Sequence, residues 1–304
     1  MNSRFGKNKT LNQTWLKSLI LLVFIQMNGQ LRESKNEIKF QYSVAPSLGK
    51  HQLETYNYTV AKRVKILGVE SSFRMSYLNS RFTYFDVPQI SGTEPYERLH
   101  ILNLDINGGK ELPKNWSFSL GINPRLSSNF SSGLSAEDVI LGFGLGVSKR
   151  WESSVLTFGL QRSTVLGKPQ LIPFASFHYE FDREFALQLG FPHSFLKYQV
   201  DERHKIKALA SAEGNYYNIT GGNALMGLEQ PTNTKLSLSG FNFSLVHEYR
   251  IQPNISTITQ IGLLTNNDFK IEDSDGQSQF TFNTNNSIYF SMGLQFNLNK
   301  NNND

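Results

Sequence analysis

The sequence predicts an all-β protein: a closed antiparallel transmembrane β-barrel of about fourteen strands, with twelve as the alternative. Three observations predict this fold. Apolar residues alternate with small or polar residues along segment after segment, the segments are long, and the connections between them alternate between short and long. No long stretch combines a helical period of 3.6 residues with helix caps, so we expect almost no helix.

The clearest alternation lies in the last predicted strand, where every second residue is apolar and those between are mostly small or polar. The apolar set is Ile288, Phe290, Met292, Leu294, Phe296 and Leu298. A period of two places alternate side chains on opposite faces of a strand. Similar stripes occur at 38–44, 69–77, 100–106, 116–122, 139–147, 156–160, 173–181, 241–245 and 255–263.

The length of these segments favours a membrane over a soluble sandwich. Most run for roughly 9–13 residues, whereas globular strands average ~5–6 and membrane-spanning strands need ~9–11. In hydrocarbon every backbone polar group must be paired within the protein, and a closed barrel achieves this without a free edge. The apolar stripe then faces lipid and the polar stripe faces the lumen. Trp116, Tyr179, Tyr249 and Tyr289 lie near strand ends, as interfacial aromatic residues would.

The predicted connections fall into two sets, one for each rim of the barrel. The short set is 107–110, 149–152, 182–183, 201–204 and 252–254, and the long set is 79–96, 128–137, 163–170, 218–235 and 266–285. Both ends of the wall then lie at one rim, which requires an even number of strands. The sequence Gly190-Phe191-Pro192 divides 184–200 into two short strands. If that stretch were one bent strand, the strand number would change.

The first 30 residues have the features of a cleaved signal peptide. Arg4, Lys7, Lys9 and Lys17 precede the apolar run 19–25, which is much shorter than the ~20 residues of a spanning helix. We therefore expect a signal peptide at 1–30, a barrel domain at 31–298 and a polar tail at 299–304. The chain has no cysteine, which excludes a lipid-anchored cysteine, disulfides and cysteine-based metal sites.

The net charge of +5 belongs largely to this leader, since the rest of the chain has 26 basic and 25 acidic residues. Charged residues make up 18% of the chain, below the roughly 25% of average soluble domains. No basic stripe with interleaved aromatic residues is present, so we predict no nucleic-acid partner.

From about residue 36 to residue 298 the chain resembles a Gram-negative outer-membrane β-barrel. The resemblance rests on the leader, the alternating connections and the last strand SIYFSMGLQF. The sequence Leu189-Gly190-Phe191-Pro192, followed by Phe195-Leu196-Lys197-Tyr198 and a charged turn, is similar to uncharacterised outer-membrane barrel families. The resemblance implies short periplasmic turns, longer extracellular loops, and contact with outer-membrane lipid and the barrel-assembly machinery. It also implies that Phe296 is the aromatic assembly signal, although NLNKNNND follows it where such barrels usually end.

Three motifs suggest chemistry but have simpler explanations. The glycines at 142, 144 and 146 lack the spacing and helix of a phosphate loop, so we expect small residues on the lumen side of a strand. His247-Glu248 begins a zinc motif, but its second histidine is absent. The segment 272–276 lacks the rest of a calcium loop. We therefore predict no metal, no cofactor and no catalytic residue.

The polar face supplies the candidate functional residues. Those predicted to line the lumen are Glu70, Arg74, Asp105, Arg125, Glu180, Lys207, Glu213, Glu248 and Gln295. Charges of both signs predict structural pairing or weak ion selectivity. The first functional hypothesis is a porin-like passive pore, or a structural surface protein, of unknown solute. The alternatives are a membrane-embedded enzyme that modifies lipid or lipopolysaccharide, and a secreted soluble β protein.

Overall fold

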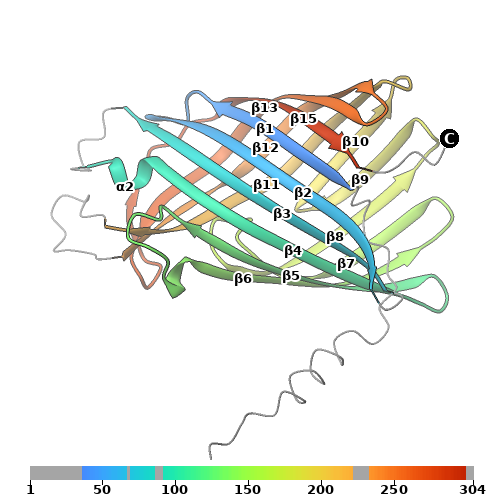
Figure 1. Ribbon diagram of the computed structural model, residues 1–304, viewed down its shortest axis with the longest axis horizontal. Helices are drawn as coiled ribbons and strands as arrows, with labels where there is room; N and C mark the ends of the chain where they lie inside the picture. Colours follow the sequence, from blue (N-terminus) through green and yellow to red (C-terminus); the bar gives the residue numbers. More distant parts are fainter. Residues whose placement is uncertain (1–35, 67–68, 86–91, 222–232, 299–304) are drawn as a thin grey trace, which may run out of the picture.

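A computed structural model describes residues 36–66, 69–85, 92–221 and 233–298. The predicted signal peptide and C-terminal tail lie outside these residues. The described part is a β-barrel with one helical turn, α2 (Glu94–Glu97), and one 3-10 turn, η1 (Ala136–Asp138) (Figure 1). None of its helices has the length and apolar character of a membrane-crossing helix.

Fifteen strands are present. They are β1 (Glu37–Ala45), β2 (His51–Ile66), β3 (Val69–Tyr84), β4 (Arg98–Leu112), β5 (Trp116–Ser128), β6 (Val139–Arg150), β7 (Ser154–Ser163), β8 (Gln170–Glu180), β9 (Phe185–Phe191), β10 (His193–Gln199), β11 (His204–Thr220), β12 (Asn233–Gln252), β13 (Ile255–Glu272), β14 (Ser278–Thr281) and β15 (Ser287–Asn297).

Fourteen of these strands close into one antiparallel barrel. Each strand from β1 to β13 pairs with the next, β13 pairs with β15, and β15 pairs with β1. The short β14 pairs with β13 and lies outside the ring. The prediction of a closed fourteen-stranded barrel is confirmed. The segment 184–200 forms two separate strands, because β9 and β10 meet in a hairpin at Pro192.

The connections form two distinct rims. Among the described residues, the turn rim carries the connections 113–115, 151–153, 181–184, 200–203 and 253–254, and the loop rim carries 46–50, 92–97, 129–138, 164–169, 192 and 273–286. The two ends of the described chain meet at the turn rim, where Leu298 N donates to Asn36 O at 2.7 Å.

The predicted turn at 107–110 is wrong. These residues lie inside β4, where Gly108 pairs with both β3 and β5. The turn lies at 113–115 instead, where Lys114 and Asn115 both have φ of +60°. Asparagine tolerates this left-handed conformation better than most residues, so Asn115 is a turn signal that the two glycines concealed.

Apolar side chains cover the outer face of the barrel. Examples are Met75, Leu141 and Met292, each more than half exposed. An aromatic row crosses β2, β3 and β4 and continues to the loop after β5, with Tyr58, Tyr77, His100 and Phe130 stacked in succession. This row, toward the loop rim, matches the aromatic girdle expected where the barrel leaves the hydrocarbon.

Of the aromatic residues predicted to be interfacial, Trp116 lies on the outer face at the turn rim, with Lys149 Nζ 5.4 Å from its ring centroid. Tyr289 differs, because it shares the inward face of β15 with Ser291 and its hydroxyl donates to Ser43 Oγ at 3.0 Å. Its position in the alternation, one residue out of phase with the apolar stripe, explains why it points inward.

Candidate functional site: the lumen and its closure at the loop rim

The nine candidate lumen-lining residues occupy positions of inward phase, out of step with the apolar outer stripe of their strands. On β3 to β5, Arg74 is in register with Asp105, and Asn123 Nδ2 donates to Asp105. Arg125 Nη1 donates to Thr164 Oγ1 at 2.7 Å. The structure therefore brings three of the candidates, Arg74, Asp105 and Arg125, together on adjacent strands.

The other candidates lie apart from this group. Glu213 accepts hydrogen bonds from Ser211 Oγ and Asn242 Nδ2, both at 2.9 Å. Glu248 pairs with Lys205, its partner in register, and the candidate Lys207, two residues along β11, has its Nζ 5.0 Å from the Phe195 ring centroid. Glu180 lies at the turn rim, where His178 Nε2 is 3.4 Å from its carboxylate. Gln295 is in register with Lys39 and Glu70 lies near the turn rim.

Away from the loop rim, the lumen is lined by small and polar side chains. The glycines at 142, 144 and 146 share the inward phase of β6, as predicted. Gly146 and Gly159 make room for the Phe174 ring, since a Cβ on Gly146 would lie 3.2 Å from it. Arg74 and Glu213 are inward yet exposed, so water has access to the lumen around them.

The loop-rim end of the lumen is filled by an apolar core, which we call the aromatic plug. Its members are 0–4% exposed: Phe82, Tyr96, Leu99, Ile101, Tyr217, Ile219, Leu236, Phe269, Ile271 and Phe282. The Phe269 and Phe282 rings stack with centroids 4.2 Å apart. The two tyrosine hydroxyls are bonded as well, Tyr217 to Ser80 and Tyr96 to Thr234, each at 3.1 Å.

Sequence reasoning missed the plug because the inward face changes character along a strand. On β11, Tyr217 and Ile219 have the same phase as Glu213. On β13 the register shifts by one residue where β12 passes from Ser239 to Phe241. A one-residue bulge reverses the facing of all later side chains. Ile261 and Leu263 therefore face lipid, whereas Phe269, of the same parity, faces the core.

A second closure at the loop rim is polar, and we call it the seam. It joins the free edge of β11, from Ala212 to Thr220, to β5 and its neighbouring loops. Four β11 carbonyls accept hydrogen bonds there: Gly214 from Thr164 Oγ1 (3.3 Å), Tyr216 from Ser127 Oγ (2.6 Å), Asn218 from Asn129 N (3.2 Å) and Thr220 from Ser131 Oγ (2.7 Å). Only one backbone bridge, Asn218 with Ser128, links β11 to β5. The seam is thus held mainly by side chains.

The loop before β6 packs on β11 and β12 beside the seam. Lys235 Nζ donates to Glu137 Oε2 and Asn218 Oδ1, both at 2.6 Å, and Asn218 Nδ2 donates to the buried Asp138 at 2.7 Å. Burial opposes ionisation of Asp138, but hydrogen bonds from Asn218, Ser128 and Ser135 hold its pKa below the ordinary value. Asp138 therefore stays ionised at neutral pH.

The remaining motifs form no chemical site. His247 is hydrogen-bonded to His204 at 3.0 Å near the turn rim, on the face opposite Glu248. Asp273 accepts the backbone N–H groups of Asp275 and Gln277, which makes 273–277 a self-contained turn. Among the described residues, no group of three His, Asp or Glu side chains is arranged to hold a metal ion. Phe296 lies on the outer face, in register with Ile38.

Several solved structures are similar in fold. The KdgM porin has 7% identity over 86% of this chain and 99% of its own, with a TM-score of 0.39. The Pseudomonas aeruginosa FadL homologue has 10% identity over 86% of this chain and 90% of its own, with a TM-score of 0.39. LpxR from Salmonella typhimurium has 9% identity over 85% of this chain and 99% of its own, with a TM-score of 0.35.

No curated protein matches the sequence. A family model does match, over residues 46–297, which include almost the whole wall of the barrel. The chain therefore belongs to the family described as a domain of unknown function, DUF6268.

Proposed function

We propose that this protein is a passive transport barrel of the outer membrane, closed at its loop rim in the state described. One observation carries the proposal: the inward-facing side chains of Arg74 and Glu213 are exposed to solvent, while the two closures of the lumen lie at one end. A barrel that served only as a surface scaffold would gain stability from a lumen packed throughout, because buried apolar area stabilises in proportion to its extent.

The two closures differ in strength, and this indicates where a solute passes. The aromatic plug is a close-packed core, and opening it would expose about ten buried apolar side chains, each worth ~1.5–3 kcal/mol. The seam depends on hydrogen bonds worth ~1 kcal/mol net each. We therefore propose that the seam opens and that the plug stays closed.

The charges of the lumen support passage more than catalysis. Arg74, Asp105 and Arg125 are grouped across adjacent strands, and Lys205 pairs with Glu248. Glu248 neutralises Lys205, and Asp105 neutralises one of the two arginines, so we expect weak selectivity for anions and no enzymatic role.

The proposal includes the location and topology of the protein. Export by a signal peptide at 1–30 would deliver the chain to the periplasm, and the barrel-assembly machinery would read Phe296 on the exposed last strand. The turn rim then faces the periplasm, the long loops face outward, and the apolar outer face contacts outer-membrane lipid.

Single-channel recording in a planar bilayer tests this function. The double variant Ser127→Ala, Thr164→Val removes two hydroxyl donors from the seam, so it should open more often than the parent protein, which stays closed for most of the record. Heat-modifiable migration on a detergent gel confirms that both proteins are folded. If the folded variant is as silent as the parent at all voltages, the lumen is not a solute path and the proposal fails.

A further inference from the structure

The wall of the barrel is too low at β9 and β10 to cross the hydrocarbon. Each strand has seven residues. At ~3.3 Å per residue and a tilt of ~40°, such a strand rises only roughly 18 Å, whereas the apolar band of these barrels is about 25 Å tall. Their neighbour β11 has 17 residues and β8 has 11. The hairpin tip at Pro192 therefore lies below the top of the apolar band, which leaves a notch in the wall.

Two free strand edges face the notch. The pairing of β8 with β9 ends at Ala175 with Phe191, and the pairing of β10 with β11 ends at His193 with Ser211. Above these points, Gln170–Phe174 of β8 has no ladder partner on this edge, and Ala212–Thr220 of β11 has a single bridge, Asn218 with Ser128 of β5. Unpaired edges are not tolerated in hydrocarbon, so another part of the chain has to cover them.

The loop Thr164–Pro169 covers the notch, and we call it the strap. Thr164 Oγ1 donates to Gly214 O at 3.3 Å, and Ser237 Oγ donates to Gly167 O at 3.0 Å. Lys168 Nζ forms an ion pair with Glu272 at 2.7 Å. The fit to β11 is close, because a Cβ on Gly214 would lie 2.6 Å from Gly167 N. These are hydroxyl and side-chain contacts, so the strap can leave without breaking a strand ladder.

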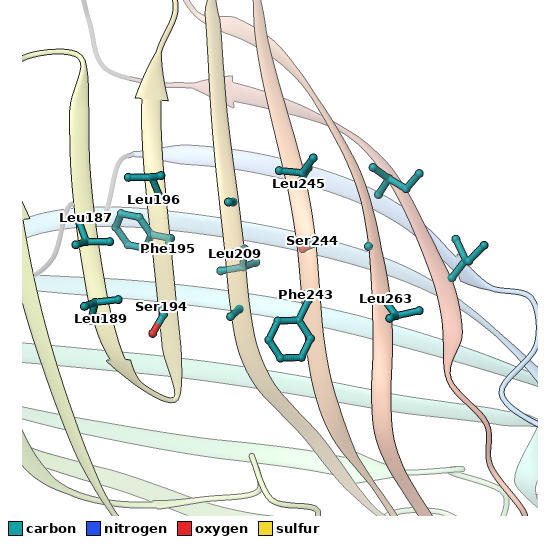
Figure 2. A pocket seen from close by; sticks show the side chains of 15 residues that line it. Leu187, Leu189, Ser194, Phe195, Leu196, Leu209, Phe243, Ser244, Leu245 and Leu263 are labelled. Carbon is teal, nitrogen blue, oxygen red and sulfur yellow. The ribbon is translucent and has the colours of Figure 1, made fainter.

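Apolar surfaces lie on both sides of the notch. On the lipid side a groove of about 730 Å³ runs along β9 to β13 and reaches Ser194 beside the hairpin tip. Figure 2 shows Leu187, Leu189 and Leu196 along it, with Phe243 and Leu245 on β12. On the lumen side, the inward positions of β8, β10 and β11 at this level include Ile172, Phe174, Phe195 and Leu209.

A polar group lies where these surfaces meet the lumen. Arg125 approaches the strap from the inside, with Nη1 2.7 Å from Thr164 Oγ1, and Arg74 and Asp105 follow on the adjacent strands. Two guanidinium groups against one carboxylate favour a negatively charged group at this position. The path from lipid to lumen thus offers first an apolar track and then a cationic end.

We propose that the strap and the seam form a lateral portal that passes a single-chain amphiphile with an anionic head between the outer leaflet and the lumen. The chain lies along the groove and then over Phe174, Phe195 and Leu209, while the head turns toward Arg125 and Arg74. This proposal rests on the proposed transport function and names its substrate class and route.

The test uses dodecyl sulfonate labelled with a nitroxide, whose permanent charge slows spontaneous crossing of a bilayer. Vesicles that contain the full mature protein and trapped ascorbate receive the probe outside, and loss of the electron spin signal reports its arrival inside. Thr164→Val should accelerate transfer at least about fivefold, because it removes the hydroxyl that donates to Gly214 O and accepts from Arg125 Nη1, and the loss of one net hydrogen bond already shifts an opening equilibrium by that factor. Thr157→Val is the matched control, because Thr157 Oγ1 bonds Ser148 Oγ within the wall at 2.9 Å.

A reversible lock provides the converse experiment. The Ser131 and Thr220 hydroxyls lie 3.1 Å apart across the seam, and the chain has no other cysteine to interfere with Ser131→Cys, Thr220→Cys. Oxidation should abolish transfer and reduction should restore it. If amphiphile transfer changes neither on oxidation of the cysteine pair nor with Thr164→Val, the portal proposal is wrong.

Liposome swelling in small neutral sugars, measured on the same preparations, separates the two proposals. Suppose that the seam-loosened variant passes sugars but transfers the amphiphile only at the rate of protein-free vesicles. The portal proposal is then wrong, and the transport function still holds. If folded protein passes neither probe, the transport function fails and the portal fails with it.

Discussion

Acid should weaken the aromatic plug through one buried histidine. His51 is 1% exposed, and its ring lies among Phe82, Tyr84, Phe269 and Phe282, with centroids 4.7–6.3 Å away. Neither ring nitrogen has a hydrogen-bond partner among the described residues. It lies seven residues beyond Tyr58 of the aromatic row, outside the membrane-spanning part of β2. Burial lowers its pKa from the ordinary 6.5 to about 4.

The magnitude follows from the two pKa values. In the unfolded chain His51 binds its proton near pH 6.5, whereas the folded protein resists protonation until about pH 4. Between these values the unfolded state binds more protons, so the free energy of unfolding falls as the pH falls. A difference of about 2.5 units corresponds to about 3 kcal/mol, lost progressively from pH 6.5 to pH 4.

The substitution His51→Phe isolates this effect. A phenyl ring keeps the stacking and cannot be protonated, so the variant should lose about 3 kcal/mol less stability than the parent between pH 7 and pH 4. Denaturant titrations in detergent micelles at four pH values measure the difference, with His178→Phe, at the turn rim, as control. Parallel pH profiles for parent and His51→Phe would refute the reasoning, as would a measured His51 pKa near 6.5.

Three further predictions concern the wall and the loops. Leu294→Arg places a charge on the lipid face and should cost ~2–4 kcal/mol in bilayer unfolding experiments, while Gln295→Arg, one residue along and facing inward, should cost little; equal costs would contradict the facing. Gly159→Ala should destabilise the barrel by ~1–3 kcal/mol, because its Cβ would lie 2.6 Å from the Phe174 ring, whereas Gly144→Ala has its nearest neighbour at 3.7 Å and should be neutral. The loop 129–138 should keep its protection against hydrogen exchange down to about pH 4 and lose it below, because the stabilisation from a lowered carboxylate pKa disappears as Asp138 takes up a proton. Asp138→Asn should remove this loss of protection in acid. If the variant still loses protection below pH 4, Asp138 is not the cause.

The wall of the barrel could be predicted from the sequence because one rule governs it. Strands that separate lipid from water must alternate, and the alternation predicted the strand number, while the break at Gly190-Phe191-Pro192 predicted the two short strands. Turn positions were less certain, since Gly108-Gly109 resembles a turn as strongly as the true one at Lys114-Asn115. Local composition cannot distinguish these two turn positions, because the register of the neighbouring strands determines which one forms.

The closures could not be predicted, because they depend on contacts between distant residues. Phe269 points inward because of a bulge that no residue pattern predicts, and its ring stacks on that of Phe82 from a distant strand. Thr164 and Gly214 are an ordinary hydroxyl residue and an ordinary glycine until the fold places them together. The inward positions of Arg74 and Glu213 followed from alternation, whereas their role in passage stays a prediction.

The aromatic plug has a consequence for the order of folding. Phe82 comes from the first third of the chain and Phe269 from the last, and their rings stack with centroids 5.2 Å apart. The contacts that join Phe82 to Phe269 have to wait for loop closure over most of the chain. Its packing is therefore a late event in folding, after the first and last strands have joined, and a barrel stalled before that step would have an unfilled mouth at its loop rim.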